Sequence, residues 1–407
     1  MRHLHVRPAE PLEDSASDAD GAHPPPLRGK VGVGGATSET PTLWTPTPDP
    51  SPQGGGGTRR RFIAGSLALS ALAALPTLDA RPALAQSAKA ELDAFSVHDP
   101  QRIEVRARPI ASFDLRDPSH LRFGALQFRS GLVLTSGFRG FGGLSALRLD
   151  AKGERFITIS DKANWFTGRI VYAGDQMTGL TEVEAAPMLG PDGATLTSRR
   201  WYDTESMAFA EGIAYVGIER VNRIVRFDFA RDGVRARGEP IAVPPGVRKL
   251  PNNKGLESLV FVPKGRKLAG TLIAISERGL DADGNIIGFL IGGPSPGSFA
   301  VRRTDNYDIS DATLLPAGDL LLLERKFSLL TGVGIRIRRI ALDTLAPGAV
   351  IDGRTIFDAD LGHEIDNMEG LSTHVDGNGD TVLTMVSDDN FSMIQRTLLL
   401  QFTLIEE

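Results

Sequence analysis

Short apolar segments separated by polar turns fill the chain after residue 100. Within these segments, hydrophobic residues either alternate with polar ones or run without interruption, and both patterns are typical of β-strands. The turns carry the Gly and Asp residues that hairpins need, as in Glu211-Gly212, Asp232-Gly233 and Asp376-Gly377. No helical period of useful length occurs after residue 90, so the pattern predicts an all-β fold.

One arrangement recurs five times: a polar cluster, a strand, a Gly- or Asp-bearing turn, and a second strand that ends on charged residues. The copies begin near residues 143, 205, 257, 311 and 369. A period of about 50–60 residues with about four short strands per unit is typical of a propeller blade. We therefore predict a β-propeller over residues 103–407.

The last copy is short, because only one strong strand, at 397–404, follows it. Propellers close by letting strands from the two chain ends share a blade, which removes free sheet edges. Strands before residue 140 would complete such a blade. Counting five copies plus this composite predicts six blades, with five as the alternative.

The first 102 residues have a different composition. Residues 1–57 are rich in Pro, Gly, Ser, Asp and Thr, a composition that predicts disorder. Because a signal peptide rarely begins so far into a chain, we expect the true translation start to lie downstream of Met1. Residues 58–85 resemble a twin-arginine signal peptide, with Arg59-Arg60 before a short apolar run and Ala83-Leu84-Ala85 at the end. We expect cleavage after Ala85, a leader over 86–102, and a periplasmic or secreted protein.

Composition narrows the possible partners. The formal net charge is −5, whereas nucleic acid and anionic membranes require a basic face. The apolar run of the signal is too short to span a membrane, so no stable membrane insertion is expected after cleavage. There is no cysteine, which excludes disulfides and thiolate metal sites. We expect a monomer that acts on a small molecule.

The repeated acidic residues are the main candidates for a functional site. In a propeller the innermost strands line a central channel, so equivalent strand ends form a ring. The candidate members of this ring are Asp161, Glu205, Glu219, Glu257, Glu277, Asp311, Glu324, Glu369, Asp388 and Asp389, with Asn253, Asn367 and Asn390 beside them. Converging carboxylates repel one another unless they are protonated, paired or neutralised by a cation.

Oxygen-only ligands suit Ca²⁺, which is the metal that the sequence predicts. The predicted metal ligands are Glu205, Glu257, Glu369, Asp388, Asp389 and Asn390. Arginines follow the terminal acid in three copies, and arginine binds phosphate and carboxylate oxygens bidentately. The predicted catalytic residues are Glu205, Glu257, Glu369, Arg220, Arg278 and Arg325. The same Glu–Arg pairs would also suit a structural bridge between neighbouring blades, and the residues leave both roles open.

The sequence contains partial matches to a serine nucleophile elbow and to calcium-binding loops, and each lacks residues that its motif requires. In Gly293-Pro294-Ser295-Pro296-Gly297, Pro296 lacks the N–H that a serine nucleophile elbow uses in its oxyanion hole. The Asp-rich turns at 281–285 and 376–380 lack the Gly and Glu of a calcium loop, so we expect hairpin turns there.

The chain resembles the phytase-like family described by "esterase-like activity of phytase" over about residues 120–405. The stretches that carry the resemblance are Phe141-Gly142-Gly143-Leu144-Ser145, Asp203-Thr204-Glu205-Ser206-Met207, Asn253-Lys254-Gly255-Leu256-Glu257-Ser258-Leu259, Leu323-Glu324-Arg325-Lys326-Phe327, Met368-Glu369-Gly370-Leu371 and Ser387-Asp388-Asp389-Asn390-Phe391. The resemblance implies an exported bacterial propeller that hydrolyses phosphoesters or carboxyl esters with calcium.

Three functions remain open from the sequence. The first is a metal-dependent phosphoesterase, in which cations neutralise phosphate and arginines hold its oxygens. The second is a lactonase or carboxylesterase of the calcium-propeller type. The third is a propeller that binds a ligand without catalysis. Basic residues that face the acidic ring would favour the first.

Overall fold

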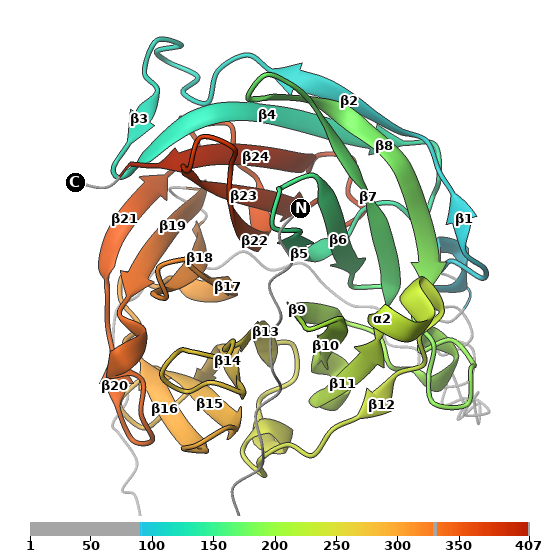
Figure 1. The fold of residues 1–407 in the computed structure, drawn as a ribbon, viewed down its shortest axis with the longest axis vertical. Coiled ribbons are helices and arrows are strands. Elements are labelled where there is room, and N and C mark those ends of the chain that lie inside the picture. Colours follow the sequence, from blue (N-terminus) through green and yellow to red (C-terminus); the bar gives the residue numbers. More distant parts are fainter. Residues whose placement is uncertain (1–89, 91, 329–331, 406–407) are drawn as a thin grey trace, which may run out of the picture. The chain divides into compact units, whose positions relative to one another are not determined.

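Five β-sheets surround a common axis in a computed structural model that describes residues 90, 92–328 and 332–405 (Figure 1). The chain is thus an all-β propeller, as predicted. The predicted disordered extension and signal peptide lie outside the described residues. In the part of the chain that is described, no helix is long and apolar enough to cross a membrane.

The first three blades follow one another along the chain. Blade 1 contains β5 (Leu144–Leu149), β6 (Arg155–Ser160), β7 (Asn164–Ala173), β8 (Gln176–Pro187) and β1 (Gln101–Arg102). Blade 2 contains β9 (Thr204–Ala210), β10 (Ile213–Ile218), β11 (Arg223–Asp228) and β12 (Glu239–Pro240). Blade 3 contains β13 (Leu256–Phe261), β14 (Thr271–Leu280), β15 (Ile286–Gly292), β16 (Gly297–Val301) and the short β20 (Val350–Ile351).

The last two blades complete the ring. Blade 4 contains β17 (Asp308–Leu314), β18 (Leu320–Ser328), β19 (Gly332–Ile340) and β21 (Arg354–Ala359). Blade 5 contains β22 (Asn367–Val375), β23 (Thr381–Asp388), β24 (Thr397–Leu404), β4 (Leu126–Ser136) and β2 (Val105–Ile110), with β3 (Arg122–Phe123) beside β4. Helical segments are short: besides residues 92–95, they are the one-turn α2 (Phe229–Asp232) and the 3₁₀ turns Thr197–Arg199, Glu219–Val221, Gly233–Arg235, Val247–Lys249 and Leu342–Thr344.

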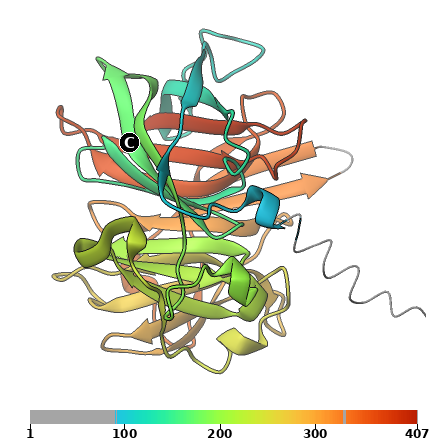
Figure 2. The same ribbon diagram turned by 90° about the vertical axis from the view of Figure 1, so that its right-hand side faces the viewer.

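The propeller has five blades, so the prediction of six is wrong and its alternative is right. The fifth copy is itself the composite blade. Its last strand, β24, pairs antiparallel with β4 from the other end of the chain, with Leu400 opposite Gly131. The sequence count treated the fifth copy and the shared blade as two sheets. Figure 2 shows the N-terminal strands in cyan and the C-terminal strands in red side by side.

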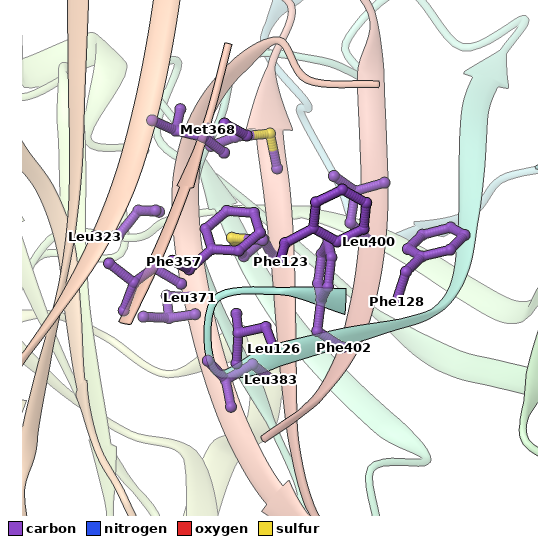
Figure 3. Close-up of a cluster of buried hydrophobic side chains, with 14 of the residues drawn as sticks. Phe123, Leu126, Phe128, Leu323, Phe357, Met368, Leu371, Leu383, Leu400 and Phe402 are labelled. Carbon is purple, nitrogen blue, oxygen red and sulfur yellow. The ribbon is translucent and has the colours of Figure 1, made fainter. Parts of the chain in front are cut away.

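The core lies between neighbouring blades and is rich in aromatic residues where blade 4 meets blade 5. Phe123, Phe128, Phe357 and Phe402 gather there with leucines from both sheets (Figure 3). The ring of Phe113 lies 5.0 Å from that of Phe402 in an edge-to-face arrangement, a favourable geometry for aromatic pairs. The N-terminal segment, which supplies strands to blade 5, thereby also packs against blade 4.

The first strand of each blade is innermost, and the side chain of Arg148 in β5 closes the axis between these strands. Its guanidinium donates to the carbonyl oxygens of Leu371 (3.0 Å), Leu259 (3.1 Å) and Ala312 (3.2 Å). It also pairs with both carboxylate oxygens of the fully buried Asp311, at 2.8 and 3.1 Å. One side chain therefore links the inner strands of blades 1, 3, 4 and 5.

We predict that Arg148→Met lowers the free energy of unfolding by about 3–5 kcal/mol, because it leaves the Asp311 carboxylate buried without its partner. Urea denaturation measures the loss. Arg155→Met, at an exposed arginine of β6, serves as the matched control and should change stability little. The double variant Arg148→Met/Asp311→Leu should recover part of the loss. A loss below about 1 kcal/mol in Arg148→Met, the level of an exposed ion pair, would contradict this role for the axial pair.

Candidate functional site

Every inner strand carries a β-bulge at the same height, where its pairing with the second strand skips one residue. The skipped residues are Ser145, Glu205, Glu257, Ser310 and Glu369. A bulge leaves the extra residue outside the ladder and redirects its side chain. At three of the five positions that residue is a glutamate, and all three glutamates line one cavity at the mouth of the channel.

The second strand of each blade supplies another residue at this mouth. Next to each bulge, the first strand pairs with Ser160, Ile218, Ser276, Glu324 or Ser387. The residue after each of these lines the cavity, which gives the set Asp161, Glu219, Glu277, Arg325 and Asp388. We call these five residues the outer ring. Four of its members are acids and one is arginine.

The cavity has a volume of about 670 Å³ and is strongly acidic. Besides the bulge glutamates and the outer ring, its polar lining consists of Asp203, Asp308, Asp366, Asn253, Asn367, Asn390, Gln395, Arg278 and Lys326. Two of these acids are already paired, since Asp308 accepts from Arg278 at 2.7 Å and Asp366 accepts from the backbone N–H of Arg396 at 3.0 Å. Among the described residues, Glu205 and Glu257 in contrast have no hydrogen-bond or ion-pair partner.

Burial and crowding raise the pKa of most of these acids. Burial first, and then the nearby Asp203 and Glu277, raise the pKa of Glu219 to about 7, although a hydrogen bond from the Gly255 N–H opposes the shift. Burial also raises the pKa of Glu369 to about 7 against the opposing charge of Arg325. Several carboxyls here therefore hold protons close to neutral pH.

The pKa values of four further acids shift in the same direction. The pKa of Asp161 rises to about 6, mainly through burial. Burial, followed by repulsion from neighbouring carboxylates, raises the pKa values of Glu205, Glu257 and Asp388 well above the ordinary range. A bound cation would relieve both effects, because it replaces the lost solvation and neutralises the crowded charge.

The oxygens left without partners fit a cation. Oε2 of Glu369 and Oδ1 of Asp161 are buried and accept no hydrogen bond within the described part of the chain. One carboxylate oxygen from each of Glu219, Glu257 and Glu277 lies within 4.8 Å of the other two. An all-oxygen set of this kind suits a hard cation such as Ca²⁺ better than a soft one.

Arg325 is held firmly at the edge of this acidic cluster. Its guanidinium lies 2.7 Å from Oδ1 of Asn367, 3.0 Å from Oε1 of Glu369 and 3.5 Å from Oε1 of Glu277. Burial alone would lower its pKa, but the surrounding carboxylates raise it above the ordinary value, so the cation is always charged. Its Nε is buried and has no partner among the described residues.

Most of the residues predicted for the site reach the cavity. Those that line it are Glu205, Glu257, Glu369, Asp388, Asn390, Arg278 and Arg325. The structure brings these seven residues to one cavity, and their catalytic and metal-binding roles remain predictions. Two of the predicted residues, Arg220 and Asp389, do not line it.

Arg220 is exposed, and its guanidinium lies 4.5 Å from the centre of the Tyr202 ring instead of facing the cavity. The carboxylate of Asp389 accepts hydrogen bonds from the N–H groups of Gly143 (2.9 Å) and Phe391 (3.0 Å) and from the hydroxyl of Thr397 (2.9 Å). These bonds occupy Asp389 as a link between blade 1 and blade 5.

Two other acids expected in the ring turn inward in blade 4. Glu324 is fully buried and pairs with Arg336 and Arg338 on β19, at 2.5 Å in each case. Asp311 pairs with Arg148 on the axis. The fourth copy is shifted by one residue, because its bulge falls on Ser310, and this places Arg325 instead of Glu324 at the cavity.

Sequence reasoning also missed some members of the site. Glu219 and Glu277 were counted in the ring but not among the metal ligands, although they form the closest acidic group with Glu257. Asp203 lines the cavity and precedes the bulge residue Glu205 by two positions, as Asn367 precedes Glu369. Alignment of the copies on their bulges would have found Asp203.

The Asp-rich turns are hairpin turns, as expected. Asp281 accepts from the N–H groups of Asp283 (3.0 Å) and Asn285 (2.8 Å) through Oδ1. Asp376 accepts in the same way from Asn378 (2.9 Å) and Asp380 (3.0 Å). These carboxylates are occupied by their own backbone turns.

Comparison with solved structures returns other proteins at low identity. The chain is similar to a structure of YCF48 bound to D1 peptide (11% identity, TM-score 0.30, covering 60% of this chain and 62% of that one). It is also similar to glutaminyl cyclase from Myxococcus xanthus (9%, TM-score 0.35, covering 65% and 92%). A third is the Cps50 (Swd1) β-propeller domain from Myceliophteria thermophila (11%, TM-score 0.30, covering 62% and 67%).

No curated protein matches the sequence. A family model does match, over residues 139–391, and its description is "Phytase-like: Esterase-like activity of phytase". This range covers more than half of the chain and contains every bulge residue and every member of the outer ring. The chain therefore belongs to the phytase-like family described by esterase-like activity of phytase.

Proposed function

We propose that this protein is an exported, calcium-dependent hydrolase of small phosphoesters. The observation that carries the proposal is the group formed by Glu219, Glu257 and Glu277, whose oxygens lie within 4.8 Å of one another in a cavity that also contains Arg325. Acids alone would suit a purely metal-binding propeller. Acids with a fixed arginine suit an enzyme that must hold both a cation and an anionic substrate.

The residues divide into two groups by chemistry. Glu219, Glu257 and Glu277 would hold the calcium ion, with Glu205, Glu369 and Asp388 in the same cavity. When bound, the ion supplies charge neutralisation for ester oxygens and a water molecule of lowered pKa. Arg325, whose side chain lines the cavity and is partly exposed, would bind a substrate oxygen.

Proton transfer would fall to the carboxyls that titrate near neutral pH. A general acid or base works best when its pKa lies near the working pH, and Glu369 has a pKa of about 7. Glu205 faces the same cavity, and no hydrogen bond or ion pair occupies its carboxylate among the described residues. These two glutamates are the candidates for moving a proton to or from the reacting group.

A second candidate is a carboxylesterase or lactonase on the same site. The apolar residues Phe327, Val333 and Ile394 in the cavity lining favour it. Arg325 and Arg278 at the cavity favour the phosphoesterase. Assays of purified protein with matched phosphate and carboxyl esters, with calcium and with chelator, decide between the two.

We predict that calcium stabilises the protein by roughly 2.7 kcal/mol at a hundredfold excess over its dissociation constant. Thermal melts with calcium and with chelator measure the effect. Glu257→Gln should abolish the calcium-dependent shift, whereas Glu104→Gln, at an exposed glutamate outside the cavity, should retain it. Identical melting temperatures in calcium and chelator for the wild type, with no metal in the purified protein, would count against the proposal.

We predict a matching pH dependence for the metal-free protein. Glu219 and Glu369 have pKa values of about 7 in the folded state against an ordinary value of 4.5, so the folded protein binds their protons more tightly. The free energy of unfolding should therefore fall as the pH rises from about 4.5 to about 7.

Calcium should reduce this fall, because the ion replaces the protons. Urea denaturation at several pH values, with chelator and with calcium, tests the dependence. Glu369→Gln should flatten the metal-free curve. A metal-free protein that gains stability across this pH range would show that the cavity acids are not crowded.

Export is proposed on the basis of the sequence. Arg59→Lys together with Arg60→Lys should abolish periplasmic accumulation, because the twin-arginine pathway requires the pair. Fractionation followed by immunoblotting measures it. Unchanged accumulation of the double variant would rule out this route.

A further inference from the structure

One wall of the acidic cavity is apolar. Phe327 at the end of β18 and Ile394 in the loop between β23 and β24 both line the cavity. Val333 also lines it and lies opposite Phe327 in the β18–β19 pairing. We call Phe327, Val333 and Ile394 the apolar rim. It belongs to blades 4 and 5.

Two of the three rim residues, Phe327 and Ile394, are unusually exposed, and Val333 is half-buried. Among the described residues, the three most exposed large hydrophobic side chains are Met393, Ile394 (91%) and Phe327 (72%). Leu361, which is also exposed, lies against Gly332 next to Val333. Exposed hydrophobic side chains scattered singly need no explanation, but a group of them at the edge of a polar cavity marks a binding surface.

The charges of the cavity are distributed unevenly relative to this rim. Arg325 and Lys326 immediately precede Phe327 on β18, so positive charge adjoins the rim. The three-glutamate group Glu219, Glu257 and Glu277 comes from blades 2 and 3. A ligand that matches both the charged region of the cavity and the apolar rim has one anionic oxygen group near Arg325 and the proposed calcium ion. It also has one apolar group on the rim.

The other walls disfavour a second anionic group. Asp161, Asp203, Glu205 and Asp388 line them. Lys162 pairs with Asp161 at 3.5 Å, and in the described part of the chain no basic side chain forms an ion pair with the other three. A substrate with several phosphate groups would place the additional groups against these acids, where like charges repel. The cavity therefore suits a monoanionic or dianionic head on an uncharged body.

We propose that the substrate is an ester in which a single phosphate group, or a carboxyl group that hydrolysis releases as a carboxylate, is joined to an apolar group, such as an aromatic ring, that lies on the apolar rim. The inference rests on the proposed function of the same cavity and names its substrate class. Phe327 and Ile394 are the specificity-determining residues. The apolar group gains affinity by removing both itself and these side chains from water.

Binding of matched head groups tests the inference without requiring turnover. Isothermal titration in calcium would compare methylphosphonate with phenylphosphonate, and acetate with phenylacetate. In the wild type, the phenyl member of at least one pair should bind about tenfold more tightly, which corresponds to about 1.4 kcal/mol. In Phe327→Ser/Ile394→Ser the ratio within that pair should fall to about one, with the affinity of the smaller member unchanged.

Two controls keep the result interpretable. Phe209→Ser changes a phenylalanine that is 41% exposed at the other end of an inner strand, and it should preserve the tenfold ratio. The calcium-dependent thermal shift should persist in the double variant, because the rim residues are not proposed metal ligands. Loss of that shift would mean that the rim supports the metal site instead of the substrate, which would overturn the inference.

The remaining outcomes separate the two proposals. Equal binding of both members of each pair in the wild type, or an unchanged ratio in the double variant, would overturn the substrate class and leave the proposed hydrolase standing. If no member of either pair binds in calcium, the proposed function fails, and the substrate class fails with it.

Discussion

The contact on which the architecture depends most is the guanidinium of Arg148 on the propeller axis. Inner strands of a propeller meet edge to edge around a space that side chains must fill, and their carbonyl oxygens need donors. Arg148 supplies donors to three other blades and forms an ion pair with the fully buried Asp311. The inner strands are thus held at a common height, and equivalent residues of different blades meet at the same level.

That common height explains the crowding at the acidic mouth. Each inner strand has its bulge at the same level, so Glu205, Glu257 and Glu369 converge on one cavity together with the acids of the outer ring. Grouping so many carboxylates lowers the stability of the fold, because each carboxylate loses solvation and repels its neighbours. Conflicts of this kind between local chemistry and stability occur in proteins mainly at functional sites, where the function compensates for them.

The repeated local pattern was enough to predict the all-β propeller and the mouth at which its acids gather, because strand–turn–strand units are encoded by neighbouring residues. The number of blades could not be predicted from neighbouring residues. It depends on β24 pairing with β4 across almost the whole chain. The expected placement of Glu324 in the ring was wrong for a different reason: the bulge of the fourth copy falls on Ser310, one residue earlier than the copies suggest, and only the strand pairing reveals this. Asp389 does not line the cavity, because its carboxylate accepts hydrogen bonds from backbone N–H groups that only the folded loop brings near it.

The single arginine in the outer ring has a geometric consequence. Five equivalent acids around an axis would present the same face to a ligand after each fifth of a turn, and a bound molecule could settle in any of five orientations. Arg325 removes that equivalence, and the serines at two of the five bulge positions, Ser145 and Ser310, reduce it further. The basic side chains that line the cavity, Arg278, Arg325 and Lys326, all belong to blades 3 and 4, so an anionic ligand of the proposed enzyme would be oriented toward these blades. A pseudo-symmetric scaffold has thus acquired a direction through changes at a few positions of its repeat.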